Sequence, residues 1–181
     1  MPTAHRTFSS PRSAIAGAIG ALRGPLHGGA NEAAMELIER FDSAEAATKG
    51  VHEMLENKEL IMGFGHRVYT TSDPRNSVNK RMSKQLADLV GDTVLYPVSE
   101  AIEKVMWDEK KLFANADFYA ATVYHFLGIP TKLFTPIFVC SRVTGWAAHV
   151  MEQRAHNKLI RPAADYTGPG LQDWLPIDER E

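Results

Sequence analysis

The 181-residue chain is predicted to fold as an all-α protein, on three observations. Apolar residues recur three and four positions apart in most segments, which is the spacing of one helix face. Glycine and proline lie at the ends of those segments, where helices stop and start. No segment shows the strict alternation of apolar and polar residues that a half-buried strand requires, and no internal repeat is present.

The first predicted helices flank a glycine-rich loop. Ser10 before Pro11 is typical of a helix N-cap with proline in the first turn, and Gly24-Pro25 should end that helix. A second helix is expected near Asn31, where apolar residues follow a 3–4–3 spacing. A third, short helix is expected over residues 51–59.

The middle of the chain should contain a long loop and three helices. Residues 61–74 contain two glycines and a proline, so we expect a loop with at most a short extended piece. Ser99 should cap one later helix, and Asp117 should lie at the start of another. The helix between the loop and Ser99 should end at Gly91 and bury a stripe of Val78, Met82, Leu86 and Leu89.

The last third of the chain divides into a helix and a tail. Residues 131–157 are rich in apolar and small side chains, which predicts a buried helix in which Cys140 is a small buried hydrophobic residue. Three prolines follow Arg161, and the chain should there become an irregular tail lying over some surface.

Composition excludes several functional classes. The net charge of −2 comes without a basic stripe, so nucleic acid is not an expected partner. No apolar run approaches the ~20 residues that span a bilayer, and the first residues lack the apolar core of a secretory signal. The single cysteine forms no disulfide within the chain and fits a reducing compartment. A cytoplasmic protein without membrane contact is therefore expected.

Three polar residues lie in loops or at helix starts where chemistry is feasible. They are His27 in GPLHGGANE, His66 in GFGHRVY and Asp117 in NADFY. The neighbouring Gly28, Gly29, Gly63 and Gly65 permit positive φ and close approach of a ligand to the backbone.

The predicted helix starts favour particular protonation states. The partial positive charge at a helix N-terminus disfavours an imidazolium at His27 and favours an ionised Asp117. One carboxylate base and two neutral hydrogen-bond donors suit proton abstraction beside a carbonyl, followed by attack on a second carbonyl.

These segments also resemble the ordered signature blocks of citrate synthases. The blocks are GPLHGGANE, GFGHRVY with DPR, NADFY, and VCSRVTGWAAHVMEQ with IRP. Their details, especially GFGHRVYTTSDPR and IRPAADYTGP, are most similar to the C-terminal half of 2-methylcitrate synthases. The resemblance covers residues 10–181 and implies the citrate-synthase helical fold. Residues 1–30 would be a remnant of the large domain, residues 31–130 the small domain, and residues 131–181 a return to the large domain and its tail.

The resemblance also implies catalytic roles. Asp117 would remove the α-proton of an acyl-CoA thioester, and His27 would hydrogen-bond the thioester oxygen of the resulting enolate. His66 would polarise the carbonyl of oxaloacetate and supply its proton as the carbon–carbon bond forms. Hydrolysis of the acyl-CoA adduct would then make the reaction irreversible in practice.

Binding roles follow from the same resemblance. Arg75 and Arg142 would clamp the carboxylates of oxaloacetate, and Arg161 would reach into the site of a neighbouring subunit in a homodimer. The backbone of Ile61, Met62, Gly63, Phe64 and Gly65 would hold the CoA adenine, and Asn115 would contact the CoA arm. No permanently bound cofactor and no metal is implied, because acyl-CoA is a substrate.

Several functions remain as alternatives. The expected reaction condenses propionyl-CoA with oxaloacetate, and citrate synthesis from acetyl-CoA is the alternative because the two donors differ by one methylene. Two histidines and a carboxylate also resemble a non-haem iron site, although local ligand spacing is missing. The family carries a further N-terminal portion that supplies another oxaloacetate-binding histidine. The further alternative is a non-catalytic, truncated fragment that only associates with other helical chains.

Overall fold

A computed structural model describes residues 10–22, 29–156, 158, 163–171 and 173–180. Within these residues the only β-type pairing is an isolated antiparallel bridge between Phe64 and Ala114, and the rest is helix and loop, so the predicted all-α class is confirmed. None of the described helices is both long and apolar enough to cross a membrane. The helices are α1 (Pro11–Leu22), α2 (Ala30–Ile38), α3 (Ala44–Glu56), α4 (Pro74–Val90), α5 (Leu95–Lys110), α6 (Ala116–Phe126), η1 (Thr131–Leu133), α7 (Phe134–Ala155) and η2 (Ile177–Glu179).

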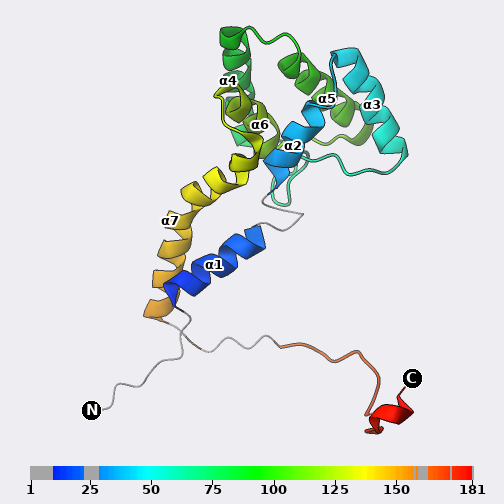
Figure 1. The fold of residues 1–181 in the computed structure, drawn as a ribbon, viewed down its shortest axis with the longest axis vertical. Helices are drawn as coiled ribbons and strands as arrows, with labels where there is room; N and C mark the ends of the chain where they lie inside the picture. The colour runs from blue at the N-terminus through cyan, green and yellow to red at the C-terminus, as the bar shows by residue number, and fades with distance from the viewer. Residues whose placement is uncertain (1–9, 23–28, 157, 159–162, 172, 181) are drawn as a thin grey trace.

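Helices α2 to α6 pack around one core, which is the upper body in Figure 1. Helix α6 lies against α2 and α4, and α3 lies against α5. The largest fully buried side chains of this core are Tyr119, Phe118, Phe134 and Met35. Burying an aromatic or methionine side chain of this kind stabilises the fold by about 1.5–3 kcal/mol. Because two of these aromatic residues follow Asp117 directly, the start of α6 is held firmly against the core.

Helix α7 begins at the core and then runs away from it, with α1 alongside (Figure 1). Among the described residues of both helices, only Phe134 is buried. The prediction of a buried helix over residues 131–157 is therefore wrong, and Cys140 is exposed rather than buried. The reason is geometric: beyond its first turns α7 lies beside α1, and one neighbouring helix covers only part of another's surface.

Two helix starts differ from the prediction. Helix α3 begins at Ala44 rather than near residue 51, and the Ser43 hydroxyl accepts a hydrogen bond from the Ala46 N–H at 3.2 Å. Helix α5 begins at Leu95, where the Asp92 carboxylate accepts hydrogen bonds from three consecutive backbone N–H groups. Ser99 is inside this helix, and its hydroxyl donates to the Leu95 carbonyl at 2.7 Å. Ser99 is thus no cap.

Helix α4 faces the core with its small side chains. Val78, Met82 and Leu89 of the predicted stripe are exposed, whereas Ser83 and Ala87 are buried. The Ser83 hydroxyl shares a buried hydrogen bond of 2.7 Å with the Thr122 hydroxyl of α6. Small residues allow α4 and α6 to approach closely, so the apolar spacing indicated a helix correctly but selected the wrong face.

Candidate active site

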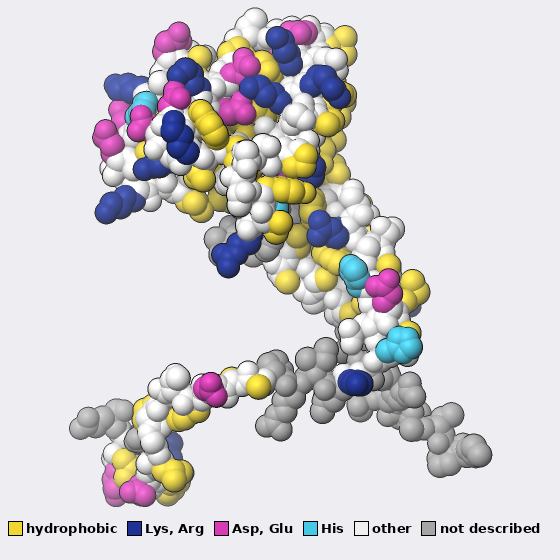
Figure 2. All heavy atoms as spheres, turned by 180° about the vertical axis from the view of Figure 1, so that it is seen from behind, with side chains coloured by type: hydrophobic (Ala, Val, Ile, Leu, Met, Phe, Trp, Pro, Cys, Tyr) yellow, Lys and Arg dark blue, Asp and Glu magenta, His cyan; other side chains and the backbone are white. Residues whose placement is uncertain are grey.

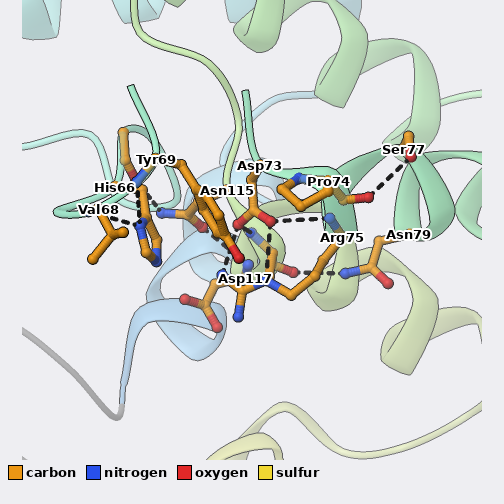
Figure 3. A network of polar contacts seen from close by, with 12 residues as sticks. His66, Val68, Tyr69, Asp73, Pro74, Arg75, Ser77, Asn79, Asn115 and Asp117 are labelled. Carbon is orange, nitrogen blue, oxygen red and sulfur yellow. Dashed lines mark hydrogen bonds and ion pairs between the residues drawn. The ribbon is translucent and has the colours of Figure 1, made fainter. Parts of the chain in front are cut away.

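Residues 61–73 form a loop that is fastened to the segment before α6 (Figure 3). The Gly65 N–H donates to the Phe113 carbonyl at 2.8 Å, and the Asn115 N–H donates to the Gly63 carbonyl at 2.9 Å. The Asn115 side-chain amide also donates to the Gly65 carbonyl at 3.0 Å. The predicted loop with a short extended piece is confirmed. We call this loop, together with the segment before α6 to which it is bonded, the platform.

Two of the four highlighted glycines adopt the backbone conformation that glycine favours. Gly63 and Gly65 have φ values of 93° and 73°. A Cβ atom at Gly63 would lie 2.9 Å from Phe118 Cβ, so the loop runs directly over the first turn of α6. Gly29, by contrast, has an ordinary φ of −91° as the N-cap of α2. Gly28 lies outside the described residues.

His66 follows the second glycine of the platform, with its imidazole oriented by the backbone. Its Nδ1 atom accepts hydrogen bonds from the Val68 and Tyr69 N–H groups, each at 3.1 Å. An Nδ1 atom that accepts carries no proton, so the neutral ring holds its proton on Nε2. The Tyr69 ring lies with its centroid 4.6 Å from that of the imidazole. His66 therefore presents Nε2–H as a hydrogen-bond donor.

Arg75 lies in the first turn of α4, where Asp73 is the N-cap. The Asp73 carboxylate accepts hydrogen bonds from Arg75 Nε at 2.9 Å and from Nη2 at 2.8 Å. The hydrogen bond that Arg75 donates to Asp73 raises the pKa of Arg75, and the nearby charge of Asp117 raises it further. The Arg75 side chain is 54% exposed, so its guanidinium is partly accessible to a ligand.

Asp117 lies in the first turn of α6, close enough to Arg75 for the two charges to interact (Figure 3). It is not the helix cap, because the Asn115 side chain caps α6 by accepting from the Asp117 N–H at 2.9 Å. The Asp117 side chain is half-buried beside the platform. An acidic residue in the first turn is favoured there by the helix dipole.

The structure thus brings some predicted site residues together and leaves others apart. His66, Arg75, Asn115 and Asp117 lie near one another (Figure 3): Asn115 bonds to Gly65 and to the Asp117 N–H, and the charges of Arg75 and Asp117 interact. Arg142 is exposed on α7, where its guanidinium lies 4.7 Å from the ring centroid of Phe138 on the same helix. His27 and Arg161 lie outside the described residues.

The described residues contain no group of three or more His, Cys, Asp or Glu side chains placed to hold one metal ion. The site contains instead hydrogen bonds that the His66 imidazole, the Arg75 guanidinium, the Asp73 carboxylate and the Asn115 carboxamide make with one another or with backbone groups. Such a set can orient a carbonyl compound with carboxylate groups and can place a carboxylate beside an acidic C–H.

Comparison with known proteins identifies the family. The family model described as the citrate synthase C-terminal domain matches residues 4–163. The chain belongs to the citrate synthase family. The resemblance drawn from the sequence blocks is therefore confirmed.

Individual members of the citrate synthase family match nearly the whole chain. A 2-methylcitrate synthase of Shewanella oneidensis is 60% identical over 96% of this chain and 46% of its own length. Citrate synthase 2 of Bacillus subtilis is 53% identical over 96% of this chain and 47% of its own length. The citrate synthase of Thermoplasma acidophilum, solved with carboxymethyl coenzyme A and oxaloacetate, superposes with a TM-score of 0.80 at 32% identity, covering 98% of this chain and 52% of that one. The chain spans about half the length of these relatives.

Two residues of the site were not predicted from the sequence. Asp73 lies in the DPR block, where Asp before Pro is a typical N-cap signal, but nothing in the sequence indicates its contact with α6. Asn79 donates from its side-chain amide to the Ala116 carbonyl at 2.8 Å, and no local pattern marks it. Both residues act across α4 and α6, which only the tertiary structure reveals.

Proposed function

We propose that this site condenses propionyl-CoA with oxaloacetate and water to give 2-methylcitrate and CoA, as part of a 2-methylcitrate synthase-like enzyme. One observation carries the proposal: the Asn115 amide bonds to the Gly65 carbonyl and caps the Asp117 N–H. His66 follows Gly65 directly, so the proposed carbonyl donor and the proposed base lie on two segments joined by a single side chain.

In the proposed reaction, Asp117 acts on the thioester and His66 acts on oxaloacetate. Asp117 is the base that takes the α-proton of the thioester, and the electron pair moves to the thioester oxygen to form an enolate. The enolate carbon then attacks the ketone carbon of oxaloacetate, and His66 Nε2–H gives its proton to the ketone oxygen. Water finally cleaves the thioester to release CoA. His27, outside the described residues, is proposed to donate a hydrogen bond to the enolate oxygen.

Positive charge at the site favours a dicarboxylate substrate. The partly exposed guanidinium of Arg75 can bind one carboxylate of oxaloacetate. Arg142, which is exposed on α7, is proposed to bind the second carboxylate. The backbone of residues 61–65 is proposed to hold the CoA adenine, with Asn115 beneath the CoA arm.

Propionyl-CoA is the preferred donor in this proposal, and acetyl-CoA is the second candidate. Relatives named 2-methylcitrate synthase and relatives named citrate synthase both match the chain, at 60% and 53% identity. One methylene in an apolar pocket changes the free energy of the transition state by about 1–3 kcal/mol, which is a rate ratio of roughly 10 to 200.

The distribution of buried residues supports the proposed domains. All the buried core residues but Phe134 lie between Ala34 and Ala121, within the proposed small domain of residues 31–130. The described parts of α1, α7 and the tail carry almost no buried side chains and would belong to the large domain. In Figure 2 the charged side chains gather over the α2–α6 body rather than over the α1–α7 arm.

A homodimer is proposed for the assembly, with Arg161 acting across the subunits. The described tail residues bear large hydrophobic side chains with little cover, since Leu171, Trp174 and Ile177 are strongly exposed. Exposed apolar surface of this kind is unfavourable in water, and a second subunit would bury it.

The test is release of CoA thiol by the purified protein from oxaloacetate with either propionyl-CoA or acetyl-CoA. The proposal predicts release that requires oxaloacetate, with the higher kcat/KM for propionyl-CoA. Faster turnover of acetyl-CoA would support the citrate synthase alternative. If neither donor releases thiol and light scattering shows only self-association of the chain, the result would support the alternative of a non-catalytic fragment.

A further inference from the structure

A buried carboxylate occupies the centre of the site without belonging to the proposed catalytic group. The Asp73 side chain is 0% exposed. Its Oδ1 atom accepts from the Arg75 N–H at 3.0 Å and from Arg75 Nε at 2.9 Å. Its Oδ2 atom accepts from Arg75 Nη2 at 2.8 Å and from the Ala116 N–H at 3.0 Å. One carboxylate therefore joins the start of α4 to the start of α6.

The backbone that leads into Asp117 is held at each peptide. The Asn115 N–H donates to the Gly63 carbonyl, and the Ala116 N–H donates to Asp73. The Ala116 carbonyl accepts from the Asn79 amide at 2.8 Å, and the Asp117 N–H donates to Asn115 Oδ1. A residue fixed at three consecutive peptides has little freedom to shift relative to Arg75.

We infer that Asp73 is a positioning residue, which fixes the position of the Arg75 guanidinium relative to the backbone of Asp117. The inference rests on the proposed function, because it assigns Arg75 to oxaloacetate and Asp117 to the thioester. Asp73 touches neither substrate. It acts by holding the oxaloacetate clamp and the base on the same carboxylate, so that the distance between the two reacting carbons is set before binding.

The chemistry of Asp73 fits this role. A buried carboxylate is stable only with its oxygens hydrogen-bonded and its charge paired, and the four donors and the guanidinium supply both. The Arg75 side-chain hydrogen bond lowers the pKa of Asp73, which favours the ionised carboxylate. Asparagine at this position would turn an N–H donor toward at least one of the four donors. The substitution therefore breaks hydrogen bonds of this side chain without changing the size of the side chain.

The test compares Asp73→Asn with Ser83→Ala in the whole chain. Ser83 on α4 makes a buried hydrogen bond to Thr122 on α6, which does not involve the residues of the site. Two quantities are measured for each variant: amide hydrogen exchange at Ala116, and the Kd of oxaloacetate and of propionyl-CoA by calorimetry. Chemical denaturation gives the loss of global stability in each variant, so that the exchange rates and Kd values can be compared with that loss taken into account.

Asp73→Asn should raise exchange at the Ala116 amide by roughly 10-fold or more beyond any global loss of stability. It should weaken oxaloacetate binding about 10-fold or more, because the Arg75 guanidinium loses hydrogen bonds that hold its orientation, while the Kd of propionyl-CoA changes less than about twofold. Ser83→Ala should change neither quantity beyond its global effect. If Asp73 were purely structural, Asp73→Asn would weaken the binding of oxaloacetate and of propionyl-CoA alike, and Ser83→Ala would do so equally. That result would overturn the inference.

Asn79→Ala provides a second variant, because it loosens the same peptide without leaving a buried charge unpaired. It should raise Ala116 exchange as well, by less than Asp73→Asn. Unchanged protection of Ala116 in both variants would contradict the positioning role. If the unmodified protein binds no oxaloacetate, the proposed function fails, while the exchange data still decide whether Asp73 holds α6.

Discussion

The side-chain amide of Asn115 donates a hydrogen bond of 3.0 Å to the carbonyl oxygen of Gly65, and the two residues are 50 positions apart in the chain. The same side chain accepts from the Asp117 N–H at 2.9 Å. One asparagine thus does the work of a helix cap and of a link between two loops. The position of His66 relative to Asp117 depends on both of these bonds.

Replacing Asn115 by alanine should destabilise the protein more than the loss of a cap alone. A lost N-cap costs about 1 kcal/mol, and the unsatisfied Gly65 carbonyl adds about 1 kcal/mol. We therefore expect Asn115→Ala to lower the free energy of unfolding by about 2 kcal/mol, measured by urea denaturation.

Ser43→Ala is the matched control for this change, because Ser43 caps α3 through one hydrogen bond and links no distant loop. It should cost about 1 kcal/mol. Equal losses in the two variants would show that the bond from Asn115 to Gly65 contributes nothing to stability.

Gly63→Ala should destabilise the platform for two separate reasons. The residue has a φ of 93°, and the new Cβ atom would lie 2.9 Å from Phe118 Cβ. Positive φ costs a non-glycine residue about 1 kcal/mol, and the clash adds about 1–3 kcal/mol because Phe118 is fully buried. Equilibrium denaturation should show a loss of about 2–4 kcal/mol.

The control for Gly63 is Gly91, which caps α4 with a φ of 75° and has open space around its Cα. Gly91→Ala should lose only the backbone part, about 1 kcal/mol. If Gly63→Ala costs no more than Gly91→Ala, the loop does not lie against α6 as described.

Much of the helical framework could be predicted from local residue patterns. Ser10 accepts a hydrogen bond from the Ser13 N–H at the start of α1, and Gly91 ends α4 in the left-handed conformation, as expected. Local capping rules fail where another element decides. Ser99 has the right side chain for a cap, yet Asp92 captures the free N–H groups earlier, and Pro97 is tolerated because it lies in the first turn of α5.

The candidate site was predictable in its residue types and not in its connections. Glycine before His66 indicated close backbone approach, and positive φ at Gly63 and Gly65 agrees with that interpretation. The contact of Asp73 with the Ala116 N–H joins residues 43 positions apart, and no local pattern encodes such a pairing. Burial also could not be predicted for α7, since apolar composition does not state which neighbours a helix will have.

Alkaline pH should unfold the protein through its buried tyrosines. Burial, together with Glu100, raises the pKa of Tyr96 from 10.0 to about 12, and burial raises the pKa of Tyr119 as well. The unfolded chain ionises both groups above pH 10.0, whereas the folded protein keeps them neutral. Stability should therefore be complete below pH 10 and fall by about 1 kcal/mol per group per pH unit above it.

Tyr119→Phe should reduce this alkaline loss of stability, because one of the buried groups can no longer ionise. Denaturant unfolding at a series of pH values checks the slope, which should be smaller in the variant above pH 10. Tyr166→Phe, at a position 81% exposed, serves as the control and should leave the slope unchanged. An unaltered slope in Tyr119→Phe would mean that Tyr119 is not held neutral by the core.

The central claim is that Asp117 is the base that ionises the acyl-CoA beside His66 and Arg75. It is tested most directly by deuterium exchange at the α-carbon of propionyl-CoA in heavy water, with oxaloacetate or a dicarboxylate analogue bound. The unmodified protein should incorporate deuterium, and Asp117→Ala should reduce the rate by at least roughly 10³-fold, since the carboxylate has no substitute at the start of α6. Exchange that persists in Asp117→Ala at the rate of the unmodified protein, or that is absent from both, would contradict the account.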